Sequence, residues 1–160
     1  MVPGYLLAQD LAAAVLAATM PAPSTILVAG CGTGSEILAI ARALLGACIT
    51  GVDPSPGMIA AARRRIDDTG LSGRVRLETA TVDALDDRPD HDACIVSMML
   101  HFIADDGGKG AFLPGIHRRL RPDARLALID PAADEGRAPA CGERARRRGC
   151  KAISFRPVAA

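Results

Sequence analysis

Short apolar runs alternate with segments of helical spacing along most of this chain. A short run that is apolar, or that alternates with polar residues, predicts a strand, whereas apolar residues three and four positions apart predict one face of a helix. On this basis strands are expected at residues 24–29, 48–52, 74–80, 93–100 and 125–130, and helices at residues 6–20, 36–45, 58–66 and 112–120. The alternation predicts a doubly wound α/β fold with one helix followed by a parallel sheet in the order 3-2-1-4-5.

The pattern changes towards the end of the chain. Residues 1–136 carry 12 Lys and Arg against 17 Asp and Glu, whereas residues 137–160 carry 7 against 1. We therefore expect a ligand-binding domain over residues 1–136 and a basic tail over residues 137–160, with a short helix at 140–149 and a short strand at 151–155. This leaves room for one added strand at most, so the outer side of the fifth strand is expected to be unpaired or swapped with another subunit.

Composition narrows the class of protein. Hydrophobic residues make up 49% of the 160 positions but aromatic residues only 2%, so aliphatic side chains must fill the core. No apolar stretch reaches the ~18 residues of a membrane span, and residues 6–20 lack the basic start of a signal peptide. The five cysteines form no CxxC pair and no ligand-like group with the three histidines. This predicts free thiols, no metal and a cytoplasmic protein.

The basic tail raises the question of nucleic-acid binding. Its arginines could contact phosphate groups, but most charge runs are solvated segments. Proteins that bind single strands usually place stacking aromatic residues among the basic ones, and this tail has only Phe155. The sequence therefore disfavours a nucleic-acid partner.

A glycine-rich turn follows the first predicted strand. Gly30, Gly32 and Gly34 remove side chains where the backbone must turn sharply and lie close to a ligand. A dinucleotide-binding turn would place its third glycine one residue later, where this chain has Ser35. Glu36, in the first turn of the next helix, would repel a pyrophosphate. The turn therefore predicts a ligand that contains adenosine but no phosphate.

Acidic residues are expected at the same edge of the sheet. Asp53 closes the second strand, where its carboxylate can accept hydrogen bonds from both hydroxyls of a ribose, and Asp83 follows the third strand. With the glycine turn and Asp53, the chain from Thr25 to Pro131 resembles the class I S-adenosylmethionine-dependent methyltransferases.

The resemblance implies a site for S-adenosylmethionine, with S-adenosylhomocysteine as the product. Residues 2–5 also resemble the entry segment of some small methyltransferases, in which a tyrosine such as Tyr5 lies over the donor. In the class I family an acidic residue such as Asp83 accepts a hydrogen bond from the adenine amino group. The alternative for Asp83 is a carboxylate that caps the turn before Leu85. The resemblance places the donor contacts at Tyr5, Gly30, Cys31, Gly32, Gly34, Asp53, Pro54, Met58, Val82, Asp83, Ala84 and Met98.

The end of the fourth strand is expected to face the methyl group of the donor. His101 is the candidate general base there, and the alternative is a histidine with no proton to move. Residues 97–100 are unlike the Asn/Asp-Pro-Pro-aromatic signature of base-amino methyltransferases. The resemblance therefore implies methyl transfer to a small molecule.

Two other functions stay open. An NAD-dependent oxidoreductase would share the first strand, turn and helix, but the sequence holds no Tyr-x-x-x-Lys pair for hydride transfer. The other is a shortened, non-catalytic S-adenosylmethionine-binding protein. The small number of residues after the fifth predicted strand favours it. For the enzyme we expect donor binding, slow turnover by the monomer and a homo-oligomer formed through the fifth strand.

Overall fold

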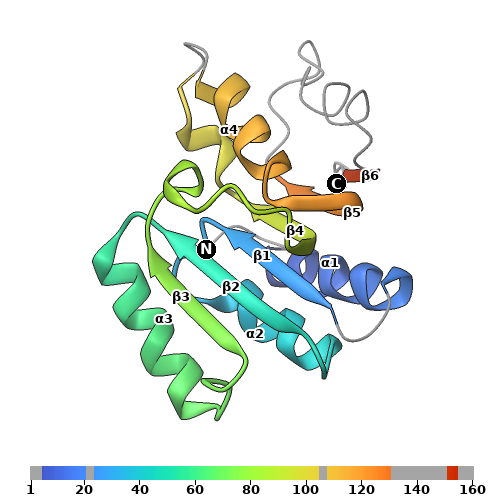
Figure 1. The fold of residues 1–160 in the computed structure, drawn as a ribbon. Helices are drawn as coiled ribbons and strands as arrows, with labels where there is room; N and C mark the ends of the chain where they lie inside the picture. The colour runs from blue at the N-terminus through green and yellow to red at the C-terminus, as the bar shows by residue number, and fades with distance from the viewer. Residues whose placement is uncertain (1–4, 21–23, 105–107, 131–150, 155–160) are drawn as a thin grey trace, which may run out of the picture.

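The computed structural model describes residues 5–20, 24–104, 108–130 and 151–154, which form a parallel sheet with helices on both faces (Figure 1). The strands are β1 (Thr25–Ala29), β2 (Cys48–Asp53), β3 (Val75–Thr79), β4 (His91–Ser97), β5 (Leu120–Ile129) and β6 (Lys151–Ser154). The helices are α1 (Tyr5–Thr19), α2 (Ser35–Ala43), α3 (Pro56–Asp68) and α4 (Gly108–His117), with 3-10 turns η1 (Val82–Ala84) and η2 (Leu100–Phe102). Among these elements the sheet order is β3-β2-β1-β4-β5-β6, and each pairing is parallel.

The central strands contribute alternate residues to two hydrophobic cores, one on each face of the sheet. Ile26 of β1 shares the first core with Leu16 of α1 and with residues of α2 and α3. Its neighbour Leu27 shares the second core with Val82 of η1 and Phe112 of α4. All five side chains are buried, which explains why the predicted strands are apolar on both faces.

The carboxyl ends of the strands bring three loops together. Ala29 pairs with Val52, and Asp53 pairs with Thr79, so the turn after β1, the end of β2 and the loop after β3 are neighbours. The strand order reverses between β1 and β4, and ligands of doubly wound sheets bind at this point.

The predicted fold class and the strand order 3-2-1-4-5 are confirmed, and α1 is the predicted first helix. The strand expected at residues 151–155 is present as β6. The prediction of an open outer side for β5 is wrong, because β6 pairs with it from Arg125 opposite Lys151 to Leu128 opposite Ser154. The self-association expected through that open side loses its structural basis.

The fourth strand is shorter than predicted. β4 ends at Ser97 instead of Leu100, because Met98 has a φ of 52° and turns the chain out of the sheet into η2. Left-handed backbone is costly for a residue other than glycine. The Met98 N–H donates to the carbonyl of Ile129, at 2.7 Å, which holds the turn against β5.

The fifth strand is longer than predicted, because β5 begins at Leu120 and includes residues 121–124, which lie between the predicted helix at 112–120 and the predicted strand at 125–130. His91 of β4 pairs with Leu120, but Ala93 pairs with Arg125, so β5 contains additional residues at this irregularity. Asp123 has a φ of 64° there. The left-handed residue absorbs the extra length without ending the strand.

The helix expected at residues 140–149 and most of the basic tail lie outside the described residues. Within the described part, no helix is long and apolar enough to cross a membrane. The described cysteines, Cys31, Cys48 and Cys94, are not joined in disulfides.

Candidate functional site

The glycine turn after β1 is tied to the end of β2. The N–H groups of Gly30 and Cys31 both donate to the carbonyl of Val52, each at 2.9 Å. Gly30 has a φ of 71°, and a Cβ at this position would collide with the sulfur of Met99. Only glycine therefore allows this strand end and the turn after β4 to approach so closely.

Asp53 organises the turn with its carboxylate. Oδ2 accepts the N–H of Gly32 at 3.0 Å, and Oδ1 accepts the N–H of Ser55 at 2.9 Å. Ser55 in turn caps α3, because its hydroxyl accepts the Met58 N–H at 3.4 Å. One carboxylate thus fixes both the glycine turn and the start of α3.

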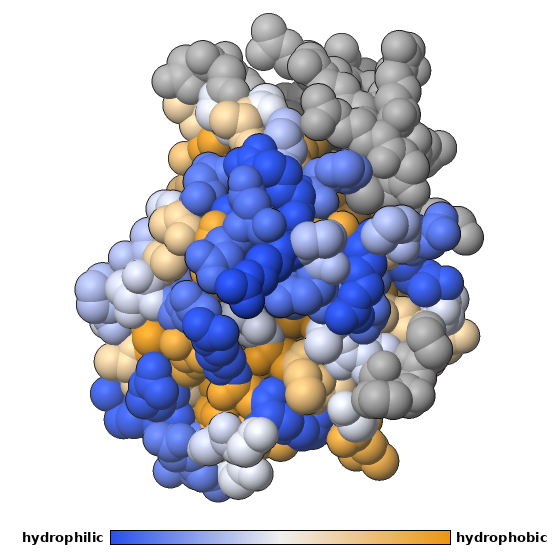
Figure 2. All heavy atoms as spheres, in the orientation of Figure 1, coloured by the Kyte–Doolittle hydropathy of each residue, from blue (hydrophilic) through white to orange (hydrophobic). Residues whose placement is uncertain are grey.

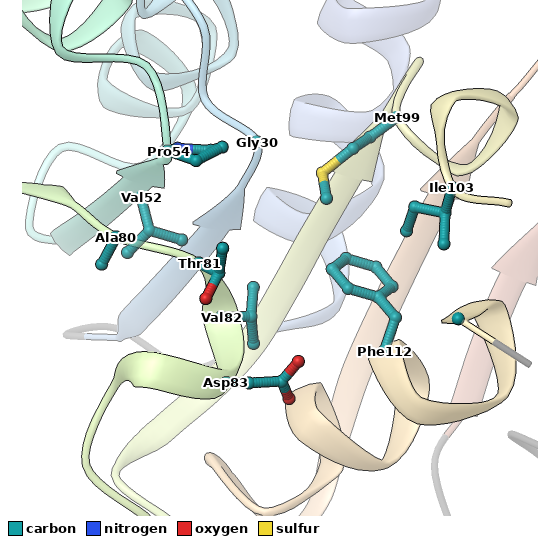
Figure 3. Close-up of a pocket in the computed structure, with 11 residues that line it drawn as sticks. Gly30, Val52, Pro54, Ala80, Thr81, Val82, Asp83, Met99, Ile103 and Phe112 are labelled. Carbon is teal, nitrogen blue, oxygen red and sulfur yellow. The ribbon is translucent and has the colours of Figure 1, made fainter.

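A cavity of about 210 Å³ opens at this edge of the sheet. Its lining is largely apolar and comes from the ends of β1 and β2, the loop after β3, and the segment from Met99 into α4. Figure 3 shows Met99, Ile103 and Phe112 gathered on one side, with Pro54, Gly30 and Ala80 on the other. The lining residues are Gly30, Val52, Pro54, Ala80, Thr81, Val82, Asp83, Met99, Ile103, Gly108 and Phe112.

Four of the predicted donor contacts line this cavity, namely Gly30, Pro54, Val82 and Asp83. The other predicted contacts do not line it. Cys31, Gly32 and Gly34 belong to the turn, Asp53 lies beside it, Met58 is 45% exposed on α3, and Ala84 and Met98 lie one residue beyond lining positions. Tyr5 begins α1, and its side chain is outside the described part.

Met99 lines the cavity where the sequence pointed to Met98. The left-handed backbone at Met98 ends the alternation of side chains along β4. A prediction that continues the strand pattern past Ser97 therefore points to Met98 as the cavity residue, although Met99 lines the cavity. Phe112 was also missed as a site residue, because its helical spacing indicates only a core position.

Two ionisable side chains near the turn are buried, Cys31 in the turn itself and Glu36 at the start of α2. Burial, followed by the charges of Asp53 and Glu36, raises the pKa of Cys31 to about 12. The N-terminus of α2 therefore does not activate the Cys31 thiol as a nucleophile. Cys31 serves as a small buried residue of the turn. Glu36 is buried at the start of α2, where it accepts a hydrogen bond of 2.5 Å from Nε2 of Gln9 in α1.

The loop from β3 to β4 forms the outer side of the cavity. Hydrophilic side chains cover this region (Figure 2), and Asp86, Asp87 and Arg88 are exposed on it. Asp83 lies at the start of this loop and pairs through Oδ1 with Nη2 of Arg118, at 3.6 Å. The loop is thus fastened to the end of α4 by opposite charges.

His101 lies in η2, between the lining residues Met99 and Ile103. Its Nδ1 is 2.7 Å from Oδ1 of Asp130, and its main-chain N–H donates to Oδ2 at 3.2 Å. Because an ionised carboxylate only accepts hydrogen bonds, Nδ1 is the donor in this contact, and Nε2 is the nitrogen left to accept a hydrogen bond in the neutral ring. The sequence pointed to His101 but gave no sign of Asp130, which is distant in the chain and follows β5.

The comparisons with known proteins agree with this geometry. Residues 26–123 match the family described as the methyltransferase domain. The chain belongs to this family. The resemblance to the class I S-adenosylmethionine-dependent methyltransferases is confirmed, and the oxidoreductase alternative is set aside.

Two curated methyltransferases are similar in sequence to this chain. Trans-aconitate 2-methyltransferase of Methylobacterium nodulans is 33% identical over 121 residues, which cover 74% of this chain and 43% of that protein. Ubiquinone biosynthesis O-methyltransferase of Methylocella silvestris is 39% identical over 84 residues, which cover 52% of this chain and 31% of that protein. The chain spans less than half the length of these relatives.

A solved methyltransferase structure has the same fold. The 1,6-didemethyltoxoflavin-N1-methyltransferase of Burkholderia thailandensis, solved with bound 1,6-didemethyltoxoflavin and S-adenosylhomocysteine, superposes with a TM-score of 0.66 at 28% identity. The match covers 80% of this chain and 54% of that one.

Proposed function

We propose that this chain binds S-adenosylmethionine at the carboxyl ends of β1 and β2 and transfers its methyl group to a small molecule. The observation that carries the proposal is the joint position of the glycine turn, Asp53 and the apolar cavity at the point where the strand order reverses. Family membership supports the same reaction.

Asp53 would hold the ribose of the donor. Each of its oxygens already accepts one backbone N–H, and a carboxylate oxygen has a second lone pair. The two remaining lone pairs suit two adjacent hydroxyls. The carboxylate is held in place before the ligand arrives, so little side-chain freedom is lost on binding.

The adenine ring would occupy the cavity, with Asp83 beside its amino group. Val52, Val82 and Phe112 offer apolar contacts to the ring faces, as most ligand pockets do. We expect Asp83→Ala to weaken binding of S-adenosylhomocysteine and to have a smaller effect on its inosyl analogue, which lacks the amino group. Equal losses for both ligands would instead assign Asp83 to the structure of the loop.

His101 would accept the proton of the acceptor molecule. When bound, S-adenosylmethionine would supply the methyl group to the acceptor oxygen and lose its sulfonium charge, and Nε2 of His101 would take the proton that the acceptor gives up. Asp130 holds Nδ1 and stabilises the charge that the ring gains. This arrangement suits a small molecule with a hydroxyl group.

A turnover assay with radiolabelled S-adenosylmethionine and a panel of small hydroxyl compounds tests this function. His101→Gln should lower turnover by about 10²- to 10⁴-fold, the usual contribution of a general base, with donor affinity unchanged. Asp130→Asn should have a smaller effect in the same direction, and Asp68→Asn on the exposed end of α3 is the control. Turnover that survives in His101→Gln would contradict the assignment, and donor binding without any turnover would indicate a non-catalytic binding protein.

The partners and location of the protein remain proposals as well. We propose a small-molecule substrate, no nucleic-acid partner and a cytoplasmic location. A homo-oligomer stays a prediction without a defined interface. The division into a donor-binding domain over 1–136 and a basic tail over 137–160 is likewise proposed.

A further inference from the structure

Arg119 is the largest fully buried side chain among the described residues, with 1% of its surface exposed. It lies between the end of α4 and the start of β5. A buried guanidinium costs free energy unless its N–H groups find partners. Its contacts therefore indicate what the residue does.

The guanidinium reaches back across the wall of the cavity. Nη1 donates to the carbonyl of Gly115 in α4, at 2.7 Å. Nη2 donates to the carbonyls of Asp83, at 3.3 Å, and Leu85, and it lies 3.0 Å from the carboxylate of Asp87. One planar side chain thus joins α4 to three residues of the loop after β3.

Gly115 brings the same two elements into direct contact. A Cβ at Gly115 would collide with Oδ1 of Asp83 and would lie 3.8 Å from Val82. Val82 and Asp83 line the cavity, and so does Phe112, one helical turn before Gly115. The spacing of α4 from the loop after β3, and with it the shape of the cavity, therefore depends on the contact at Gly115 and on the hydrogen bonds of Arg119.

We propose that Arg119 is a positioning residue that sets the width of the base pocket and the place of Asp83, and so determines how well the protein selects adenine. The proposal rests on the proposed function, because it assumes that the donor base occupies this cavity. Arg119 touches no ligand in this account. It acts through the carbonyls of Asp83 and Leu85.

The first variant is Arg119→Lys, which keeps the charge and much of the stem. An ammonium group cannot hold three carbonyls and a carboxylate in the geometry of the planar fork. We expect affinity for S-adenosylhomocysteine to fall about tenfold, which corresponds to losing one hydrogen bond with a charged partner. The inosyl analogue should lose less, so the ratio of the two dissociation constants should move towards one.

The second variant, Gly115→Ala, tests the same contact from α4, because its added methyl group would meet the side chain of Asp83. Its methyl group should displace the Asp83 carboxylate while the helix gains a residue of higher propensity. Gly110→Ala is the matched control, because the same change in the same helix meets nothing within 4 Å. Adenine selection should fall in Gly115→Ala and stay at the wild-type value in Gly110→Ala.

The measurement is calorimetry with S-adenosylhomocysteine and S-inosylhomocysteine on the full chain, with thermal unfolding of each variant. A wild-type chain that binds neither ligand would overturn the proposed function itself. Wild-type binding with no preference for adenine would overturn the adenine contact of Asp83 and, with it, the role of Arg119. An unchanged preference in both variants, or equal loss of both ligands, would overturn the role of Arg119 and leave donor binding intact. If Arg119→Lys does not fold, unchanged adenine selection in Gly115→Ala relative to Gly110→Ala would still overturn the proposal, because the place of Asp83 would then not determine the selection.

Discussion

At the scale of single residues, Asp53 has the most connected position in the site. Its carboxylate accepts N–H groups from Gly32 and Ser55, and these fix the glycine turn and the start of α3. The sequence alone indicates a ligand contact at this position. The structure adds a second role, because the same carboxylate holds the glycine turn in place.

Asp53→Ala should therefore lower two quantities. Donor affinity should fall about 10- to 150-fold, as expected when a charged hydrogen-bonding partner is lost. The free energy of unfolding should fall by about 1–3 kcal/mol, because two N–H groups lose their acceptor. Calorimetric titration and urea unfolding measure the two effects, Asp68→Ala is the control, and unchanged donor affinity would contradict the ribose assignment.

The thiol of Cys31 should be inert although it lies beside a helix start. Burial, with the nearby charges of Asp53 and Glu36, raises its pKa to about 12, so the neutral thiol persists far above neutral pH. At pH 8 iodoacetamide should modify the exposed Cys48 and leave Cys31 unmodified. Peptide mass mapping over time compares the two sites, and equal rates would show that Cys31 is accessible as a thiolate.

At the scale of elements, Asp92 fastens the beginnings of β1, β4 and β5. Its carboxylate accepts the N–H of Thr25 at 2.7 Å and pairs with Arg121 at 2.5 Å. Burial alone would raise the pKa of Asp92, but these hydrogen bonds and the Arg121 charge together lower it.

Because the pKa of Asp92 is lowered in the folded protein, the stability that its carboxylate contributes decreases at acidic pH. The stabilisation is complete above the unfolded-state pKa of about 3.9 and is lost as the pH falls through the lower folded-state value. Asp92→Asn should therefore unfold at a lower temperature than the wild type at pH 7, and this difference should shrink below about pH 4. A difference that stays constant from pH 7 to pH 3 would contradict the assignment.

The elements also show what a sequence pattern can predict. Apolar runs locate β1, β2 and the middle of β4, because their residues must be buried on both faces. The pattern fails where the backbone leaves the regular repeat, at Met98 and at Asp123, since neither residue type signals a left-handed conformation. This is why the sequence favours Met98 over Met99 as a site residue.

Contacts distant in the chain are the other limit. Asp130 meets His101 only because β4 and β5 pair, and Arg119 reaches the loop after β3 only after α4 folds back. In the sequence Arg119 stands between Arg118 and Leu120 near the end of a helix, where a basic residue is usually exposed. The spacing of residues along the chain therefore predicts neither contact.

At the scale of the whole molecule, the described residues contain the elements proposed to hold the donor. The glycine turn, Asp53 and the cavity all lie within the segment that matches the methyltransferase domain. β6, the short strand expected near the end of the chain, pairs with the outer side of β5 and extends the sheet beyond the predicted order 3-2-1-4-5.

The most direct test of this account is a calorimetric titration of the full chain with S-adenosylmethionine, repeated with NAD and with Asp53→Ala. We expect saturable binding of one S-adenosylmethionine per chain, much weaker binding by Asp53→Ala, and no binding of NAD. A wild-type chain that fails to bind S-adenosylmethionine, or that binds NAD equally well, would show that this site does not hold a methyl donor.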